Sequence, residues 1–201
     1  MSGTVIVAAF DVDGTLTRRD TFLPFLWRLA GPGLVLRVAR CTPALLAYAA
    51  GKRSKTAAKS AVIEVMFAGL TPEQLQVHGR AHALALLRDG LKPEGRARLE
   101  WHQRQGHQVA LVSASPDTYV RALGELLGAD AALCTRIERG ADGQYGIAGE
   151  NCVGDEKVRR LWAWTPRSAV KELYAYGNSS GDHALLAAAD HAHFRSFGAP
   201  L

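Results

Sequence analysis

The stretch from Thr4 to Phe10 constrains the fold more than any other short segment of this chain. Its residues are β-branched, small or apolar, without the polar alternation of a half-exposed strand. Such a run predicts a strand buried on both faces, as in a parallel sheet covered by helices. The run ends abruptly in two acids, Asp11 and Asp13, followed by Gly14. We therefore expect an α/β protein with polar chemistry at the end of its first strand.

The spacing of the two acids indicates a site. In open α/β sheets the ligand crevice lies at the carboxyl ends of the strands. Two ionised carboxylates this close repel each other unless a cation lies between them or one of them is protonated. A calcium loop of the EF-hand type does not fit, because Leu16 and Phe22 stand where that loop needs Gly and Glu.

A long helical segment follows the first strand, with helices expected at 21–30, 34–50, 55–68 and 71–88. Four consecutive helices are not a simple crossover between parallel strands, so they indicate an inserted module. Strands and helices then alternate, which predicts a doubly wound, Rossmann-like parallel sheet. The expected organisation is a core of residues 1–17 and 89–201 with a helical cap of residues 18–88.

Three of the expected strands end in polar side chains. These are Asp11 and Asp13, Ser113 and Ser115, and Asn178 and Asp182. Lys157, near the start of an expected helix, adds a cation. A nucleophile, an acid/base, hydroxyl groups and a fixed cation are what phosphoryl transfer requires. Carboxylate and carbonyl oxygens suit Mg²⁺.

The motifs that carry these residues are DVDGTLT, LVSAS, CVGDEKVRRL and YGNSSGD, in that order. With a helical insert after the first motif, they resemble the haloacid dehalogenase superfamily of aspartyl phosphatases. More narrowly, the chain is similar to subclass IB, the phosphoserine-phosphatase-like branch with a helical cap. The pair Asp11 and Asp13 argues against the dehalogenases of the superfamily, which lack the second acid.

The resemblance implies a role for each matching residue. Asp11 would be the nucleophile, and Asp13 would protonate the leaving alcohol and then activate water. Lys157 would neutralise the nucleophile and the phosphoryl group. The binding roles implied are phosphate at Ser113 and the Ala114 backbone, a substrate ammonium at Asp20, and Mg²⁺ at Asp11, the Asp13 main chain, Asn178 and Asp182.

Two positions leave alternatives open. Asn178 stands where the family's last motif commonly has an acid, so either its amide oxygen binds Mg²⁺ with less charge or Asp182 takes the principal role. Asp20 has an equally weighted ordinary role, which is to cap the helix that begins near Thr21.

Composition and charge limit the kinds of molecule that the protein is expected to bind. Hydrophobic residues make up 48% and charged residues 21%, an ordinary globular balance, and the net charge is +5. No aromatic-basic platform indicates nucleic acid, whereas an anionic small substrate or membrane surface accounts for the charge equally well. Three dispersed cysteines and the absence of a signal peptide favour a cytoplasmic protein. His78 and His82 have a spacing that can bind zinc but lack the accompanying Glu, so we expect them to be structural.

The expected function is Mg²⁺-dependent hydrolysis of a phosphomonoester, with a small substrate such as phosphoserine favoured. The alternatives are a lipid phosphate of the phosphatidylglycerophosphate type and a phosphate-binding relative without turnover. Residues 21–55 are strongly apolar and basic, similar to caps of lipid-phosphate relatives, which would allow peripheral membrane contact through the cap. For these apolar residues we favour internal packing of the cap. The sequence leaves the oligomeric state open.

Overall fold

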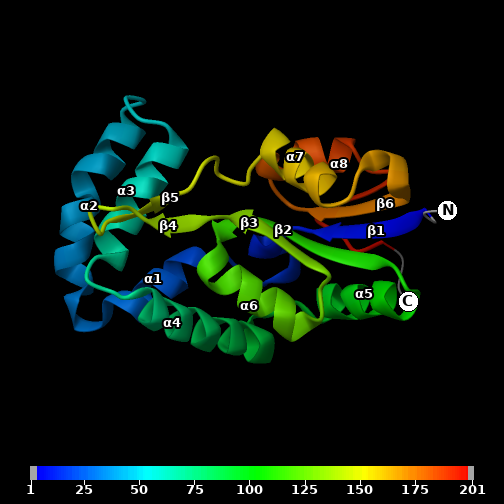
Figure 1. Ribbon diagram of the computed structural model, residues 1–201, viewed down its shortest axis with the longest axis horizontal. Coiled ribbons are helices and arrows are strands. Elements are labelled where there is room, and N and C mark those ends of the chain that lie inside the picture. The colour runs from blue at the N-terminus through cyan, green and yellow to red at the C-terminus, as the bar shows by residue number, and fades with distance from the viewer. Residues whose placement is uncertain (1–3, 199–201) are drawn as a thin grey trace.

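The computed structural model describes residues 4–198 and has a parallel sheet at its centre. The sheet has five strands in the order β3-β2-β1-β6-β7 (Figure 1). These strands are β1 (Val5–Phe10), β2 (Gln108–Pro116), β3 (Ala131–Thr135), β6 (Val170–Gly177) and β7 (His191–Phe194). All of their pairings are parallel. The expected doubly wound α/β fold is confirmed.

Helices cover both faces of this sheet. One face carries α5 (Pro93–Arg104) and α6 (Asp117–Leu127), and the other carries α7 (Asp155–Trp164) and α8 (His183–Ala187) (Figure 1). Ala8 and Phe10 of β1 belong to the apolar cluster of the first face, and Val7 and Ala9 to that of the second. Water reaches none of the four side chains, which explains why the strand shows no polar alternation.

The register of the sheet brings the polar strand ends together. Phe10 pairs with Leu111 of β2 and with Tyr176 of β6. Asp11 directly follows Phe10, and Ser113 and Asn178 each come two residues after the partners of Phe10. Parallel strands in this register therefore deliver the candidate residues to one edge of the sheet.

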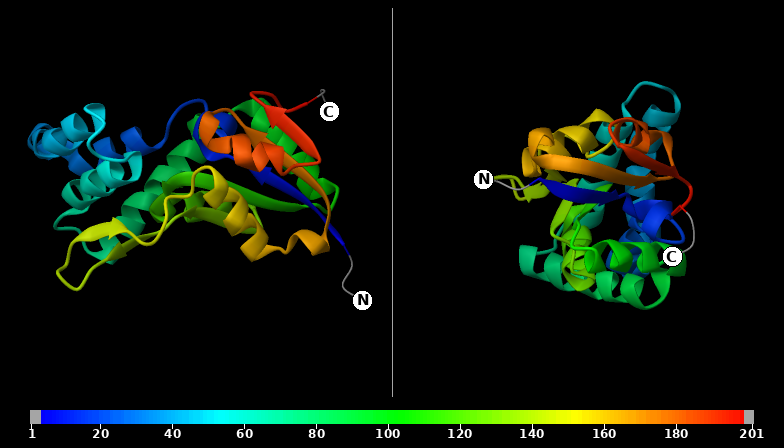
Figure 2. Two further views of the ribbon diagram at one scale, coloured as in Figure 1. Left: turned by 90° about the horizontal axis from the view of Figure 1, so that it is seen from above. Right: turned by 90° about the vertical axis from the view of Figure 1, so that its right-hand side faces the viewer.

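Four helices separate β1 from β2 along the chain. They are α1 (Phe22–Ala30), α2 (Leu34–Ala49), α3 (Lys55–Phe67) and α4 (Pro72–Ala85). They lie beyond the carboxyl ends of the strands, and α2 forms the outer end of the molecule (Figures 1 and 2). The chain leaves and re-enters the sheet region side by side, where Thr17 pairs with Leu91. Within residues 4–198, no helix has the length and apolarity that crossing a bilayer requires.

Among the contacts that attach these helices to the rest of the molecule are a hairpin on α3 and the packing of α4 on α6. The antiparallel hairpin of β4 (Ile137–Arg139) and β5 (Tyr145–Ile147) lies against α3 (Figure 1), and Tyr145 donates to the Leu70 carbonyl at 3.1 Å. Helix α4 packs on α6 so closely that a Cβ on Gly79 would lie 1.9 Å from the Thr118 carbonyl oxygen. Glycine at position 79 therefore permits the approach of the two helices.

Candidate active site

A buried lysine joins two of the strand-end carboxylates. Lys157 Nζ donates to Asp11 Oδ1 at 2.7 Å and to Asp182 Oδ1 at 2.6 Å. The Lys157 side chain is 2% exposed, and both carboxylates are buried as well. Sequence motifs that are 171 residues apart, as counted from Asp11 to Asp182, thus meet at one cation.

Burial and charge act on these groups in opposite directions. Burial raises the pKa of Asp11 to about 6, although Lys157 and its hydrogen bond oppose this rise. Burial alone would lower the pKa of Lys157, but Asp11 and Asp182 outweigh it and raise that pKa above its ordinary value. One lysine shared by two ionised carboxylates leaves a net negative charge at the edge of the sheet.

Asp182 also organises the loop that carries Asn178. Its Oδ2 accepts from the backbone N–H groups of Asn178 (3.1 Å) and Ser179 (2.9 Å) and from the Ser179 hydroxyl (2.8 Å). These bonds and Lys157 lower the pKa of Asp182 despite its burial. Gly154, just before α7, donates its N–H to the Gly181 carbonyl at 2.9 Å, which fixes the start of α7 beside this loop.

The turn after β1 is shaped to contact Asn178. Gly14 has a positive φ of +74°, and a Cβ there would lie 2.3 Å from Asn178 Nδ2, so only glycine fits. Thr17 closes the turn, because its Oγ1 accepts from Gly14 N at 3.2 Å and donates to the Val12 carbonyl at 2.9 Å. Within residues 4–198 the Asn178 side-chain amide has no hydrogen-bond partner, unlike both oxygens of Asp182.

Asp13 makes its hydrogen bonds to hydroxyl groups and a backbone N–H, and none of them is to Lys157. Its Oδ1 accepts from Thr21 N (2.7 Å) and Thr21 Oγ1 (2.5 Å). Its Oδ2 accepts from Ser115 Oγ (2.6 Å) and Ser113 Oγ (3.2 Å). The Thr21 hydroxyl also contacts Tyr119 Oη at 2.8 Å. The two acids of the first motif therefore occupy different environments, one beside a cation and one among hydroxyl groups.

The other residues expected at the site have the following surroundings. Ser113 is buried and accepts from Ser115 N at 3.0 Å, and the Ala114 carbonyl accepts from Thr135 Oγ1 at 2.6 Å. Asp20 is exposed and accepts from Leu23 N at 3.0 Å, which gives it the helix-capping role considered from the sequence. Buried His82 contacts the Thr21 carbonyl through Nε2 at 3.0 Å, as expected of a structural histidine.

Sequence reasoning missed Lys59 of α3. Its ammonium donates to the Ala114 carbonyl and to Asn151 Oδ1 (3.4 Å), and it lies 5.2 Å from the centre of the Phe22 ring. Burial lowers the pKa of Lys59 to about 8, although Asp13 and Asp20 oppose this effect. Nothing in the sequence distinguishes Lys59 from the other lysines of 52–59, because its surroundings come from Ala114 and Asn151, which are distant in sequence.

The donor set at this edge fits Mg²⁺. Asp11 supplies a carboxylate beside an excess of negative charge, and the unpartnered Asn178 amide adds a hard oxygen. Mg²⁺ keeps several waters and needs few protein ligands. Within residues 4–198, no cluster of three or more His, Cys, Asp or Glu residues is arranged as a metal site.

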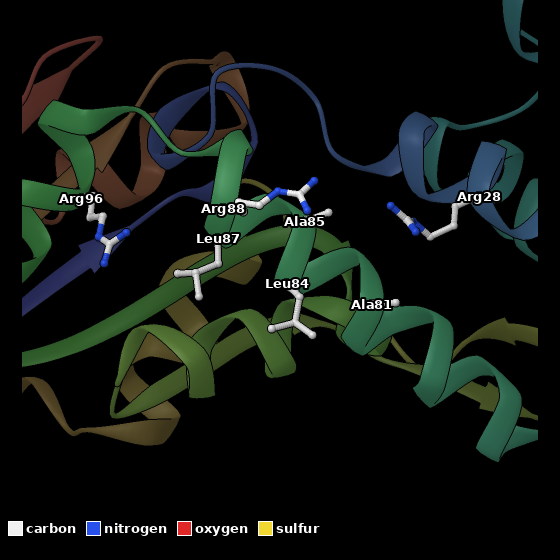
Figure 3. A pocket seen from close by; sticks show the side chains of 7 residues that line it. All are labelled: Arg28, Ala81, Leu84, Ala85, Leu87, Arg88 and Arg96. Carbon is white, nitrogen blue, oxygen red and sulfur yellow. The ribbon is translucent and has the colours of Figure 1, made fainter.

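A separate pocket of about 650 Å³ lies among α1, α4, the turn Leu86–Gly90 that follows α4, and α5. It is lined by Arg28, Ala81, Leu84, Ala85, Leu87, Arg88 and Arg96 (Figure 3). Arg88 and Arg96 already pair with neighbouring acids, Asp89 at 2.5 Å and Glu100 at 2.8 Å. None of the strand-end residues lines this pocket.

The fold and the strand-end cluster define a class of protein. The family model for haloacid dehalogenase-like hydrolases matches residues 8–187. The chain belongs to this family, and the expected hydrolase class is confirmed.

Particular relatives agree with this assignment. The chain is 39% identical over 196 residues to Protein CicA of Caulobacter vibrioides, covering 96% of this chain and 86% of that protein. A protein of unknown function from Bordetella pertussis Tohama I has the same fold, with a TM-score of 0.76, 23% identity and coverage of 92% and 87%. A substrate-bound phosphoserine phosphatase shares the fold at a TM-score of 0.62 and 19% identity, with coverage of 92% and 83%.

Proposed function

We propose that this protein hydrolyses phosphomonoesters in two steps through an aspartyl-phosphate at Asp11. The observation that carries the proposal is the contact of buried Lys157 with both Asp11 and Asp182, with Asp13 held separately among hydroxyl groups. A buried cation beside one acid and a second acid in a different environment suit nucleophilic and acid/base roles, respectively.

In the first step, a carboxylate oxygen of Asp11 attacks phosphorus, and the bond from phosphorus to the leaving oxygen breaks. Asp13 donates a proton to that oxygen, and the alcohol departs. In the second step, Asp13 removes a proton from water as the water attacks phosphorus, and the bond from Asp11 to phosphorus breaks. Lys157 keeps Asp11 oriented and opposes the charge that develops on the phosphoryl oxygens.

We propose Mg²⁺ as the cofactor, held by Asp11, the Asp13 main-chain carbonyl and Asn178. When bound, it would neutralise charge on the phosphoryl oxygens. Because both oxygens of Asp182 already accept hydrogen bonds, we assign Asp182 to positioning Lys157 and the Asn178 loop. Asn178 is then the ligand from this loop.

We further propose that residues 18–88 act as a cap that covers the site and excludes water. The contacts of Lys59 and Thr21 with the strand-end residues support this role. Lys59 brings a cation from the cap to the carboxyl end of β2, where an anionic substrate would enter. Ser113 and the Ala114 backbone are proposed to receive phosphate oxygens, and Asp20, close to Lys59, a substrate ammonium.

The substrate proposed first is a small phosphomonoester such as phosphoserine. One observation favours a second candidate, a lipid phosphate: many apolar side chains of the cap are exposed. A phosphate-binding protein without turnover is disfavoured, because Asp11, Asp13 and Lys157 are all present.

A substrate panel tests the proposal. Phosphate release from phosphoserine, other small phosphomonoesters and lipid phosphates is measured with Mg²⁺ and with a chelator. We expect Mg²⁺-dependent release, and Asp11→Asn should lower kcat by at least about three orders of magnitude while the circular dichroism spectrum is unchanged. Near wild-type activity in Asp11→Asn, or release that is indifferent to the chelator, would contradict the mechanism.

A further inference from the structure

Helix α2 is apolar on the side that faces water. Of its 16 residues, Cys41 is the one that is buried among those whose side chains the structure describes. Six of its large apolar side chains are exposed: Val35, Leu36, Val38, Leu45, Leu46 and Tyr48. Tyr48 lies about two turns after Cys41 and so on the same side of the helix, and we call the other five residues the outer face of α2. Val35 is 81% exposed and Leu46 is 64% exposed. The internal packing favoured from the sequence is therefore wrong for these residues.

The position of the outer face suits contact with a plane. Helix α2 lies at the extreme end of the molecule, with α1 and α3 behind it (Figures 1 and 2). Its inner side packs mainly on α3. A single helix of 16 residues presents a convex rod about 24 Å long. A rod of this shape can lie along a flat surface without a groove on either partner.

Along residues 21–63, the segment that contains α2, the charge has one sign, and the first acid after it is Glu64 of α3. From Thr21 to Ile63 there is no Asp or Glu, while the same segment contains seven Lys and Arg residues. Arg40, Lys52, Arg53 and Lys55 of this set are exposed. A helix with one apolar face and flanking cations is typical of segments that lie in the interface of an anionic membrane.

We infer that the outer face of α2 docks the protein peripherally on an anionic lipid bilayer. A second copy of the chain is a poorer occupant. An isologous dimer would bring the same patch of both copies together, and the surrounding cations would then face each other with no acid on 21–63 to pair with. A bilayer with anionic headgroups accepts both the apolar side chains and the cations. The inference concerns where the protein binds and does not depend on the proposed hydrolysis.

Vesicle flotation of the full chain tests the inference. The vesicles consist of phosphatidylcholine alone or of an equal mixture of phosphatidylcholine and phosphatidylglycerol. We expect binding to the anionic vesicles that weakens as salt is raised. Leu36→Ser/Leu46→Ser should reduce it at least about tenfold, since two apolar anchors are lost. Lys52→Glu/Arg53→Glu should also reduce it, by about fivefold or more for each cation removed.

The matched control is Val77→Ser/Leu84→Ser, which removes two exposed apolar side chains from α4 instead of α2. It should bind vesicles as the wild type does. All variants are first compared with the wild type by circular dichroism and thermal unfolding, since exposed positions should tolerate these changes. Asp11→Asn should bind vesicles normally, which separates docking from catalysis.

Three results would overturn the inference. The first is no binding to anionic vesicles even at low salt. The second is undiminished binding by Leu36→Ser/Leu46→Ser. The third is sedimentation showing that the wild type self-associates through α2, with the same variant monomeric and the vesicles unbound.

Discussion

The carboxyl edge of the sheet and helix α2 depart from ordinary burial in opposite directions. At the sheet edge, the charged side chain of Lys157 is 2% exposed, whereas on α2 the apolar side chain of Val35 is 81% exposed. Charged groups are seldom fully buried and large apolar patches are seldom exposed unless they serve a purpose.

The two regions therefore differ in what they exclude from water or expose to it. Under the proposed function, the sheet edge keeps charge out of water because preorganised electrostatic groups act most strongly where water is excluded. The outer face of α2 keeps apolar groups in water, which indicates a contact made outside the folded chain. Helix α3 connects the two regions, since it packs behind α2 and places Lys59 against the end of β2.

After the loss of the proposed nucleophile in Asp11→Asn, the largest effect is expected for Lys157→Met. This change leaves Asp11 and Asp182 buried without their cation, so kcat should fall by about two orders of magnitude or more. The free energy of unfolding near pH 7 should also fall by about 3–5 kcal/mol, as when one partner of a buried ion pair is removed. Phosphatase assays and urea unfolding measure the two effects.

Lys171→Met is the control for this change, because Lys171 pairs with Glu172 at the surface, at 3.7 Å. It should change the free energy of unfolding by less than about 1 kcal/mol. If Lys157→Met behaved like Lys171→Met, the buried network would not be the functional centre.

Much of the sheet edge was predictable from sequence because its signals are local. A buried strand followed by Asp11 and Asp13 needs no tertiary information, and parallel strands in register bring Asn178 and Asp182 to the same edge. Lys59 could not be found in this way. Its contacts are with Ala114 and Asn151, which are distant in sequence, and an isolated lysine in a helix is ordinarily solvated.

The orientation of α2 was unpredictable for a different reason. Its sequence carries apolar residues around most of the helix, so periodicity does not indicate which side faces the protein. The structure shows that the side bearing Cys41 faces α3 and that Val35, Val38 and Leu46 face outward. Whether an apolar residue is buried in the core or exposed on the surface depends on tertiary contacts, which a single sequence does not specify.

The next largest effect is expected on the free energy of unfolding in acid, and it comes from one buried histidine of the core. His102 is fully buried, and burial lowers its pKa to about 3, with His107 as the next cause. Below about pH 6.5, His102 is protonated in the unfolded chain but stays neutral in the folded protein. The free energy of unfolding therefore falls as the pH falls toward 3. Between pH 7 and pH 5 this loss should be about 2 kcal/mol.

Urea unfolding at both pH values measures the loss. His102→Phe removes the titrating group, so the difference between the two pH values should shrink by about 2 kcal/mol. His183→Phe replaces an exposed histidine and should keep the wild-type difference. An unchanged pH dependence in His102→Phe would assign the acid sensitivity to other groups.

A smaller effect is expected for Lys59→Met, which removes the cation that the cap supplies. KM for an anionic phosphomonoester should rise by about tenfold with a smaller change in kcat, as for the loss of one charged hydrogen bond. The pKa of Lys59 is lowered to about 8, so the cation is present below pH 8 and lost above it. The wild-type KM should therefore rise above pH 8, whereas that of Lys59→Met should show no such rise.

Lys55→Met is the control, because Lys55 is exposed one turn earlier on the same helix. It should keep the wild-type KM at pH 7. Because Lys55 helps to lower the pKa of Lys59, the rise of KM should remain in this variant but begin at a slightly higher pH. Equal KM values for Lys59→Met and the wild type at pH 7 would show that the cap does not contribute a cation to substrate binding.

The smallest effect is expected where the sheet edge departs from its family. Asn178 lies against Gly14 with no hydrogen-bond partner for its amide among residues 4–198, whereas Asp182 is fully engaged with Lys157 and its own loop. Asn178→Asp should therefore tighten Mg²⁺ binding by about fivefold, because ligand charge sets affinity at such sites. Calorimetric titration with Mg²⁺ measures this affinity without relying on turnover.

Ser180→Asp is the control, because it adds the same charge at an exposed position of the same loop. It should leave the Mg²⁺ affinity nearly unchanged, since solvent screens the added charge. If both variants bind Mg²⁺ as the wild type does, Asn178 is not a ligand, and Asp182 becomes the stronger candidate despite its hydrogen bonds.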